Sequence, residues 1–178
     1  QLLAAAGADI LYAPTFETMY PDGFVTTISL SDITAPLCGE FRAGHFAGVA
    51  TIVAKLLLQA GPDMAVFGEK DYQQLKVIEK MTAQLGLDIR IVGVAIGRSR
   101  TGLALSSRNA YLADPQIRVA SALYGTLTAI AGRMEPGIDL AAQCAWGRQA
   151  LLDAGFDTVD YFEIRDAAPL APAEMFGP

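Results

Sequence analysis

Cysteine and histidine are scarce in this chain. Its 178 residues include two cysteines, Cys38 and Cys144, and one histidine. The cysteines do not form a CxxC pair, so the sequence offers no zinc cluster of the Cys/His type. We expect two reduced thiols in a cytosolic protein, because disulfides are rare in that compartment.

Long apolar runs and basic clusters are missing as well. No run approaches the roughly 18 apolar residues that cross a bilayer, so no membrane-spanning segment is expected. Lysine and arginine total 13 against 19 acidic residues and do not cluster, which argues against a nucleic-acid surface. Local positive charge can still bind a small anion. The 52% hydrophobic content is enough for one substantial core, alone or with a small appendage.

The first part of the chain alternates between strand and helix patterns. Short apolar runs at residues 9–13, 64–67 and 89–94 predict buried strands. Residues 46–58 and 71–85 have helical periodicity. This order predicts an α/β fold with a parallel sheet and right-handed crossovers.

The N-terminal residues carry weaker signals. Residues 1–8 look like the end of a helix with Gly7 as its C-cap, which suggests that a segment precedes them. Residues 25–30 are rich in threonine and predicted to be extended.

The buried face predicted for the second long helix, residues 71–85, consists of Tyr72, Leu75, Ile78, Met81 and Leu85.

The pattern changes after Asn109. Asp114 can N-cap a helix with Pro115 at its first position, and an apolar stripe continues toward residue 134. A second helix is predicted over residues 140–154 and a strand over residues 158–165. We therefore predict two domains, an α/β part at residues 1–111 and a small α+β domain at residues 112–178.

Gly68-Glu-Lys-Asp71 stands where a predicted strand meets a helix. A helix start favours a phosphate because its N–H groups are unpaired and its dipole end is positive. Gly68 allows close approach of the backbone, Lys70 adds a mobile charge, and Gln74 can bind a polar substrate group. The alternative is an ordinary solvated helix start formed by the three charged residues.

Ser106-Ser107-Arg108-Asn109 gathers hydroxyls, a guanidinium and an amide in four residues. Arginine bridges phosphate oxygens in a bidentate manner, and serine adds short hydrogen bonds. The alternative is a turn whose serines bond to the local backbone. Both motifs follow predicted strands, and open α/β sheets bind ligands at the carboxyl ends of their strands. This favours a nucleotide phosphate site.

His45 begins the first long helix, three residues after Arg42. Both side chains can bind a carboxylate or a phosphate, although a structural capping role for His45 fits as well. The apolar face with Val49, Ile52 and Val53 is more often core than pocket. The sequence has no Ser–His–Asp signature, because the single histidine would have to serve as the base and nothing else in the sequence supports that role.

Taken in order, these motifs resemble the pantoate–β-alanine ligase (pantothenate synthetase) family. The resemblance covers nearly the whole chain and implies a partial Rossmann-like sheet of the nucleotidyltransferase type. It rests on Ala13-Pro14, Tyr20-Pro-Asp-Gly23, Pro36-Leu-Cys-Gly39, residues 42–48, the two motifs above, and Tyr161-Phe-Glu-Ile-Arg-Asp166.

The resemblance implies an ATP- and Mg²⁺-dependent ligase of coenzyme A biosynthesis. Pantoate would attack the α-phosphate of ATP to give pantoyl adenylate and pyrophosphate, and β-alanine would then displace AMP. No covalent nucleophile is needed, so positioning and charge stabilisation would carry the reaction. The family also implies a homodimer in the cytoplasm, with no nucleic-acid or membrane partner.

The resemblance also assigns residues to each substrate. Catalytic roles would fall to Lys70, Ser106, Ser107 and Arg108. Pantoate would contact Gln74, His45, Arg42, Val49, Ile52 and Val53, while the metal ligands stay unassigned. ATP would contact Gly68, Glu69, Lys70, Asp71, Gly97, Leu105, Ser106, Ser107 and Arg108.

The chain also departs from the family pattern. The family's N-terminal segment and its C-terminal tail have no counterpart here, so part of the site is expected to be missing. Ala43 replaces a usual proline and Thr101 a usual aspartate, which would alter loop stiffness rather than chemistry. The alternatives are a related nucleotidyltransferase with another acid substrate and a truncated module without catalysis.

Overall fold

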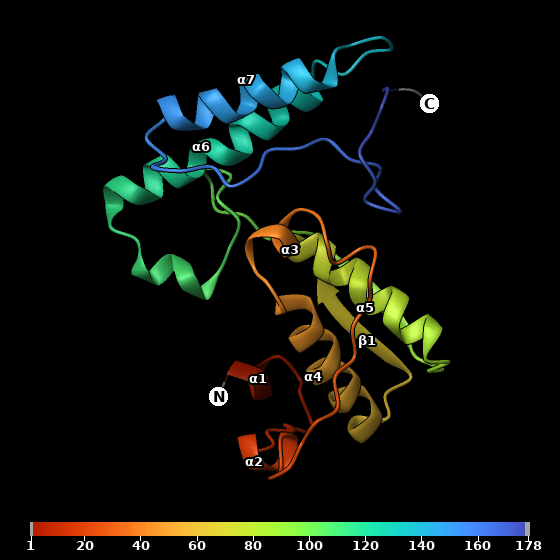
Figure 1. Ribbon diagram of the computed structural model, residues 1–178. Coiled ribbons are helices and arrows are strands. Elements are labelled where there is room, and N and C mark those ends of the chain that lie inside the picture. Colours follow the sequence, from red (N-terminus) through yellow and green to blue (C-terminus); the bar gives the residue numbers. More distant parts are fainter. Residues whose placement is uncertain (1, 177–178) are drawn as a thin grey trace.

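The computed structural model describes residues 2–176 (Figure 1). A lower part contains a parallel sheet and its flanking helices, and an upper part contains a pair of helices (Figure 1). The elements are, in order, α1 (Leu2–Ala5), α2 (Phe16–Met19), α3 (Cys38–Phe41), α4 (His45–Ala60), β1 (Met64–Gly68), η1 (Glu69–Asp71), α5 (Tyr72–Gln84), β2 (Arg90–Val94), η2 (Ser107–Tyr111), α6 (Asp114–Ala131) and α7 (Leu140–Asp153).

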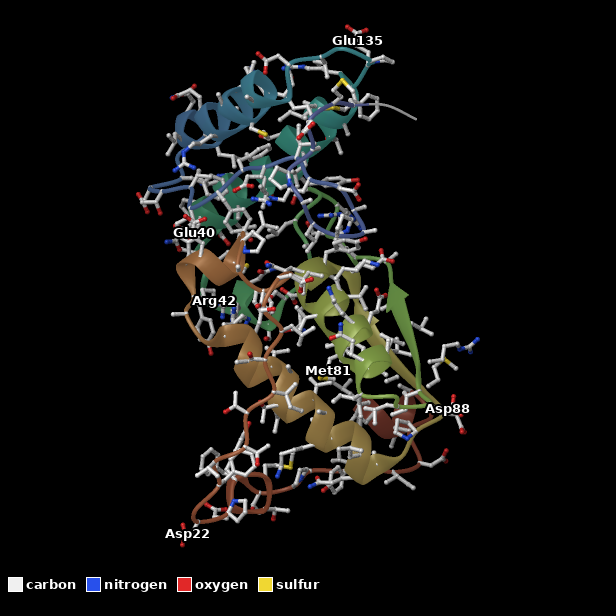
Figure 2. The ribbon with its side chains drawn as sticks, turned by 45° about the vertical axis from the view of Figure 1, so that its right-hand side comes forward. Asp22, Glu40, Arg42, Met81, Asp88 and Glu135 are labelled. Atoms are coloured by element: carbon white, nitrogen blue, oxygen red, sulfur yellow. The ribbon has the colours of Figure 1, made fainter. Side chains whose placement is uncertain are left out.

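The β1–α5–β2 unit confirms the predicted parallel sheet. β1 and β2 pair in parallel, with Met64 opposite Arg90 and Gly68 opposite Val94. α4 and α5 pack together beside this pair, and Met81 lies between the two helices (Figure 2). The centre of the core consists of Ala50, Ala54, Leu57, Val77, Ile78 and Met81.

The prediction that the residue 64–67 strand is fully buried is wrong. Ala65 and Phe67 pack against the core, whereas Met64 and Val66 are 43% and 58% exposed. Alternate side chains of a strand point to opposite faces, and the described helices cover only one face. The buried face predicted for α5 also needs correction, because Tyr72 and Leu85 are exposed and Val77 is buried instead.

Three predicted extended segments do not form strands. Residues 9–13, 25–30 and 158–165 have no ladder partner among residues 2–176, and Ile10 and Leu11 are 87% and 72% exposed. A strand requires a neighbour to pair its backbone groups. The last segment makes only an isolated bridge, between Arg165 and Pro172.

The long helices confirm the periodicity. α4 ends at Ala60 and is capped by Gly61, whose φ of 54° is left-handed, and Gly7 follows α1 with a φ of 83°. α6 begins at Asp114, one residue earlier than predicted, because the Gln116 side chain accepts a hydrogen bond from the Ala113 N–H.

The division into domains at residue 112 stays a prediction. Within residues 2–176, no helix has both the length and the apolar character needed to cross a membrane.

Candidate active site

Two cavities meet at Lys70, just beyond the carboxyl end of β1. One has a volume of about 250 Å³ and the other about 430 Å³, and Lys70 lines both. We name them the Gln74 cavity and the Arg108 cavity. This places the two sequence motifs on adjoining surfaces, as expected for the carboxyl edge of a parallel sheet.

The Gln74 cavity brings together three segments that are distant in sequence. Arg42 follows α3, and His45 is the first residue of α4; Arg42 is labelled in Figure 2. Gln74 comes from the first turn of α5, one turn after Lys70. The C-terminal segment adds Tyr161. Cationic, amide and phenol groups therefore surround a space suited to a small polar acid.

The Arg108 cavity contains part of the serine-rich loop. Ser106 and Arg108 line it with Lys70, while Ser107 is absent from its described lining. The Ser106 hydroxyl also accepts a hydrogen bond from the Arg108 N–H at 3.2 Å and so caps η2. The predicted local role of the serine is thus confirmed, and it coexists with a position on the cavity wall.

Gly97 and Leu105 belong to a hairpin beside this cavity. The Gly97 carbonyl accepts a hydrogen bond from the Leu105 N–H at 2.8 Å, and Arg98 bridges to Ala104. The Leu105 side chain is 61% exposed. Neither Gly97 nor Leu105 is part of the described lining of the Arg108 cavity, so their contact with a nucleotide stays a prediction.

The strand-to-helix junction has room for a ligand. A β-carbon built at Gly68 would meet no atom within 4 Å, so this backbone can be approached closely. Lys70 lies 3.5 Å from the Asp71 carboxylate, and both side chains are substantially exposed. Glu69 lies against Gly93 of β2 and does not line either cavity among the described contacts. Lys70 is therefore the mobile charge of this junction.

Positive charge accumulates around His45. Burial lowers the pKa of His45 first, and the charges of Arg42 and Arg108 lower it further, whereas Asp71 opposes them. Arg42 and Arg108 are thus electrostatic neighbours of one imidazole although 66 residues separate them in sequence. The positive charges that act on His45 make this part of the cavity suited to binding an anionic substrate.

The apolar face of α4 lies elsewhere. Val49 and Val53 pack against the hydrophobic core, and neither they nor Ile52 line the Gln74 cavity. The core interpretation of this face is therefore favoured. The physical reason is the direction of α4, which begins at the cavity with His45 and then runs along α5.

Sequence reasoning from individual motifs missed several residues at the site. Tyr161 and Cys38 line the Gln74 cavity, and their Oη and Sγ atoms are 2.9 Å apart. The Arg98 guanidinium lies 3.9 Å from the centre of the Tyr124 ring in the Arg108 cavity. The Pro36–Gly39 and Tyr161–Asp166 motifs held the only signal for the first pair, and no signal pointed to the second.

A metal ion has few protein ligands here. Among residues 2–176, no three His, Cys, Asp or Glu side chains gather closely enough to hold one. Mg²⁺ is commonly bound through one or two carboxylates together with substrate phosphates. The exposed Asp71 carboxylate beside Lys70 is suited to binding Mg²⁺ together with substrate phosphates.

The chain is similar in sequence to one family of known proteins. The sequence profile of the family described as pantoate-beta-alanine ligase matches residues 1–176. The chain belongs to the pantoate-β-alanine ligase family. It is 53% identical to a pantothenate synthetase of Paramagnetospirillum magneticum, with 97% of this chain and 61% of the relative covered. Its identity to a pantothenate synthetase of Rhodospirillum rubrum is 50%, with 94% and 60% covered.

Solved structures of the pantoate-β-alanine ligase family have the same nucleotidyltransferase-type fold. Pantothenate synthetase from Thermus thermophilus is 42% identical, with a TM-score of 0.91 over 99% of this chain and 64% of that one. The ligase from Francisella tularensis, complexed with Beta-gamma ATP and β-alanine, is 32% identical with a TM-score of 0.70. That match covers 84% of this chain and 56% of the Francisella chain. This chain thus spans about 60% of the length of the curated relatives above.

Proposed function

We propose that this chain forms the larger part of a pantoate–β-alanine ligase that uses ATP. The observation that carries the proposal is the position of Lys70 on the boundary of two cavities. The Gln74 cavity would hold pantoate and the Arg108 cavity would hold ATP. Lys70 then lies where the acid must meet the phosphate, which is where charge develops during the reaction.

The reaction needs two displacements. A carboxylate oxygen of pantoate bonds to the α-phosphorus of ATP, and pyrophosphate leaves. The β-alanine amine then bonds to the acyl carbon of the pantoyl adenylate, loses a proton, and AMP leaves. Lys70 and Arg108 would stabilise the phosphate charge, Gln74 would bind the acid, and Arg42 with His45 would add positive charge at the acid.

ATP and β-alanine are supported as substrates by similarity. The Francisella relative was solved with Beta-gamma ATP and β-alanine bound, at 32% identity to this chain. Mg²⁺ would arrive with the nucleotide, whose phosphate oxygens supply ligands that the described residues do not. The Asp71 carboxylate would complete that coordination.

The family resemblance supports two further proposals about the whole protein. It would form a homodimer, which sedimentation velocity can test. It would also act in the cytoplasm, consistent with two cysteines that are both free in the structure.

The test combines binding and turnover. ATP with Mg²⁺ is titrated calorimetrically into the chain and into Lys70→Ala and Lys80→Ala variants. The two lysine side chains have similar exposure, 39% and 36%, but Lys80 pairs with Asp32 away from both cavities. We expect affinity to fall about tenfold in Lys70→Ala and to hold in Lys80→Ala. Equal affinities in all three proteins would overturn the ATP assignment.

Pyrophosphate release identifies the acid. Release that requires pantoate and disappears in Lys70→Ala supports the ligase. Release with a different acid but not with pantoate would indicate a related nucleotidyltransferase. ATP binding without release under any condition would show that this chain alone carries an incomplete site.

A further inference from the structure

Tyr161 lies on the C-terminal segment but contacts the short helix α3. Its hydroxyl is 2.9 Å from the Cys38 thiol, and its ring stacks on Phe41 with centroids 6.0 Å apart at 28°. Cys38 and Phe41 are the first and last residues of α3. One side chain therefore contacts both ends of this helix.

α3 cannot hold its position by itself. It has four residues, far fewer than an isolated helix needs for stability. Its N-cap, Leu37, has a φ of 56°, which is a strained conformation for a residue other than glycine. Contacts with other parts of the chain must therefore fix both the helix and the turn that follows it.

Gln73 fixes the start of α3 from the side of α5. Its amide nitrogen donates to the carbonyls of Ile33 and Pro36 at 3.0 and 2.8 Å. Its amide oxygen accepts from the Cys38 N–H at 3.2 Å. No comparable hydrogen bond from α5 reaches the end of α3 among the described contacts. That end depends on the stack between Phe41 and Tyr161.

Arg42 follows α3 directly and lines the Gln74 cavity with Tyr161. We propose that Tyr161 is a positioning residue, which holds α3 and thereby fixes Arg42 at the wall of the Gln74 cavity. Its relevance to acid binding rests on the proposed function. The positioning itself does not, because it follows from contacts within the unliganded chain.

Burial raises the pKa of the Tyr161 phenol, and its hydrogen bond with Cys38 adds to this. The phenol therefore stays neutral at ordinary pH and can keep its contact with Cys38. A charged phenolate would instead attract Arg42 directly. The charge of Arg42 also acts on the phenol, but a neutral phenol forms no ion pair with it, so the restraint that we propose runs through α3.

His45 reports the position of Arg42, and it is the only histidine in the chain. The charged groups that act on it are Arg42, Arg108 from η2 and Asp71 from η1, and Lys70 lines the same cavity. If Arg42 moves away, the pKa of His45 rises toward its ordinary value. A two-dimensional NMR titration of the imidazole measures this without any ligand.

The experiment compares the chain with Tyr161→Ala, Tyr161→Phe, Arg42→Gln and the double variant Arg42→Gln/Tyr161→Ala. Tyr161→Ala should raise the His45 pKa, and Tyr161→Phe, which keeps the ring on Phe41, should raise it less. In the Arg42→Gln background, Tyr161→Ala should add no further rise, because the two changes act through the same charge. Tyr12→Ala, which removes an exposed tyrosine bonded to Gln59, should change nothing.

An additional rise of similar size in the Arg42→Gln background would overturn the proposal, since Tyr161 would then act only by excluding water. An unchanged His45 pKa in Tyr161→Ala would overturn it as well. If that variant does not fold, Phe41→Ala takes its place, because Phe41 is 48% exposed and its loss is tolerable. Failure of ATP to bind the wild-type chain would contradict the proposed function and leave this result intact.

Discussion

The ring of Tyr124 on α6 lies directly against Gly102 in the hairpin that precedes the serine-rich loop. A β-carbon at Gly102 would come within 2.4 Å of Tyr124 Cδ1. The Arg98 guanidinium lies 3.9 Å from the centre of the same ring and donates to the Gly102 carbonyl at 3.1 Å. α6 thereby holds the hairpin that carries the loop to the Arg108 cavity.

Gly102→Ala should therefore destabilise the protein in two ways. Its φ of 84° is left-handed, which costs about 1 kcal/mol for alanine, and the clash with Tyr124 adds roughly 1–3 kcal/mol. Gly23→Ala is the matched control, because Gly23 has a φ of 78° and open space around it. Urea unfolding should show a clearly larger loss for Gly102→Ala, and equal losses would refute the steric contribution.

Gln73 and Gln74 are neighbours with opposite tasks. Gln73→Leu should cost about 2–4 kcal/mol of unfolding free energy, because it removes three hydrogen bonds and leaves the Ile33 carbonyl and the Cys38 N–H without the partner that Gln73 supplies. Gln74→Leu should change stability by less than about 1 kcal/mol and weaken binding of the acid substrate. Chemical denaturation and calorimetric titration of both variants check the contrast. A large loss of stability in Gln74→Leu together with weaker binding in Gln73→Leu would contradict these roles of the two side chains.

Met81 is 1% exposed and lies between α5 and α4 (Figure 2). Met81→Ala should reduce the unfolding free energy by about 2–5 kcal/mol through loss of buried surface and the cavity left behind. Leu58→Ala, at an α4 residue that is 64% exposed, should change it by about 0.5 kcal/mol or less. Thermal unfolding of both variants measures the difference. Similar losses would show that the interface between α4 and α5 is loose.

Stability should fall on acidification partly because of His45. Its folded-state pKa is below the ordinary 6.5, so the unfolded chain binds a proton more readily. This contribution is complete above pH 6.5 and is lost as the pH falls from 6.5 through the folded-state pKa. His45→Gln should show a shallower decrease in urea-unfolding free energy over that window. Parallel profiles for the two proteins would exclude the contribution.

The sequence was a good guide where the signal is local. The periodicity of residues 46–58 and 71–85 predicted α4 and α5, and the runs around them predicted the parallel pair β1 and β2. Lys70, Ser106 and Arg108 were predicted to share a site, and all three line the Arg108 cavity. The helices and the strand pair depend on spacing within one supersecondary unit, whereas the shared cavity follows from the carboxyl ends of two parallel strands lying at one edge.

Features that depend on a partner were predicted less well. The apolar run at residues 9–13 has the composition of a strand, but strand formation requires a neighbour that residues 2–176 do not provide. Val49 and Val53 have the same apolar pattern whether they face a ligand or the core, and only the packing of α4 on α5 separates the two. The Tyr161–Cys38 contact joins residues 123 positions apart, which no local pattern encodes.

The separation of 123 positions between Cys38 and Tyr161 affects how the protein folds during its synthesis. The paired residues of β1 and β2 are 26 positions apart, whereas Cys38 and Tyr161 are 123 apart, so chain-closure entropy delays the second contact more than the first. During synthesis, α3 has no aromatic partner until Tyr161 has left the ribosome. A nascent or prematurely terminated chain that ends before that point can bury most of its core and still lack one wall of the Gln74 cavity.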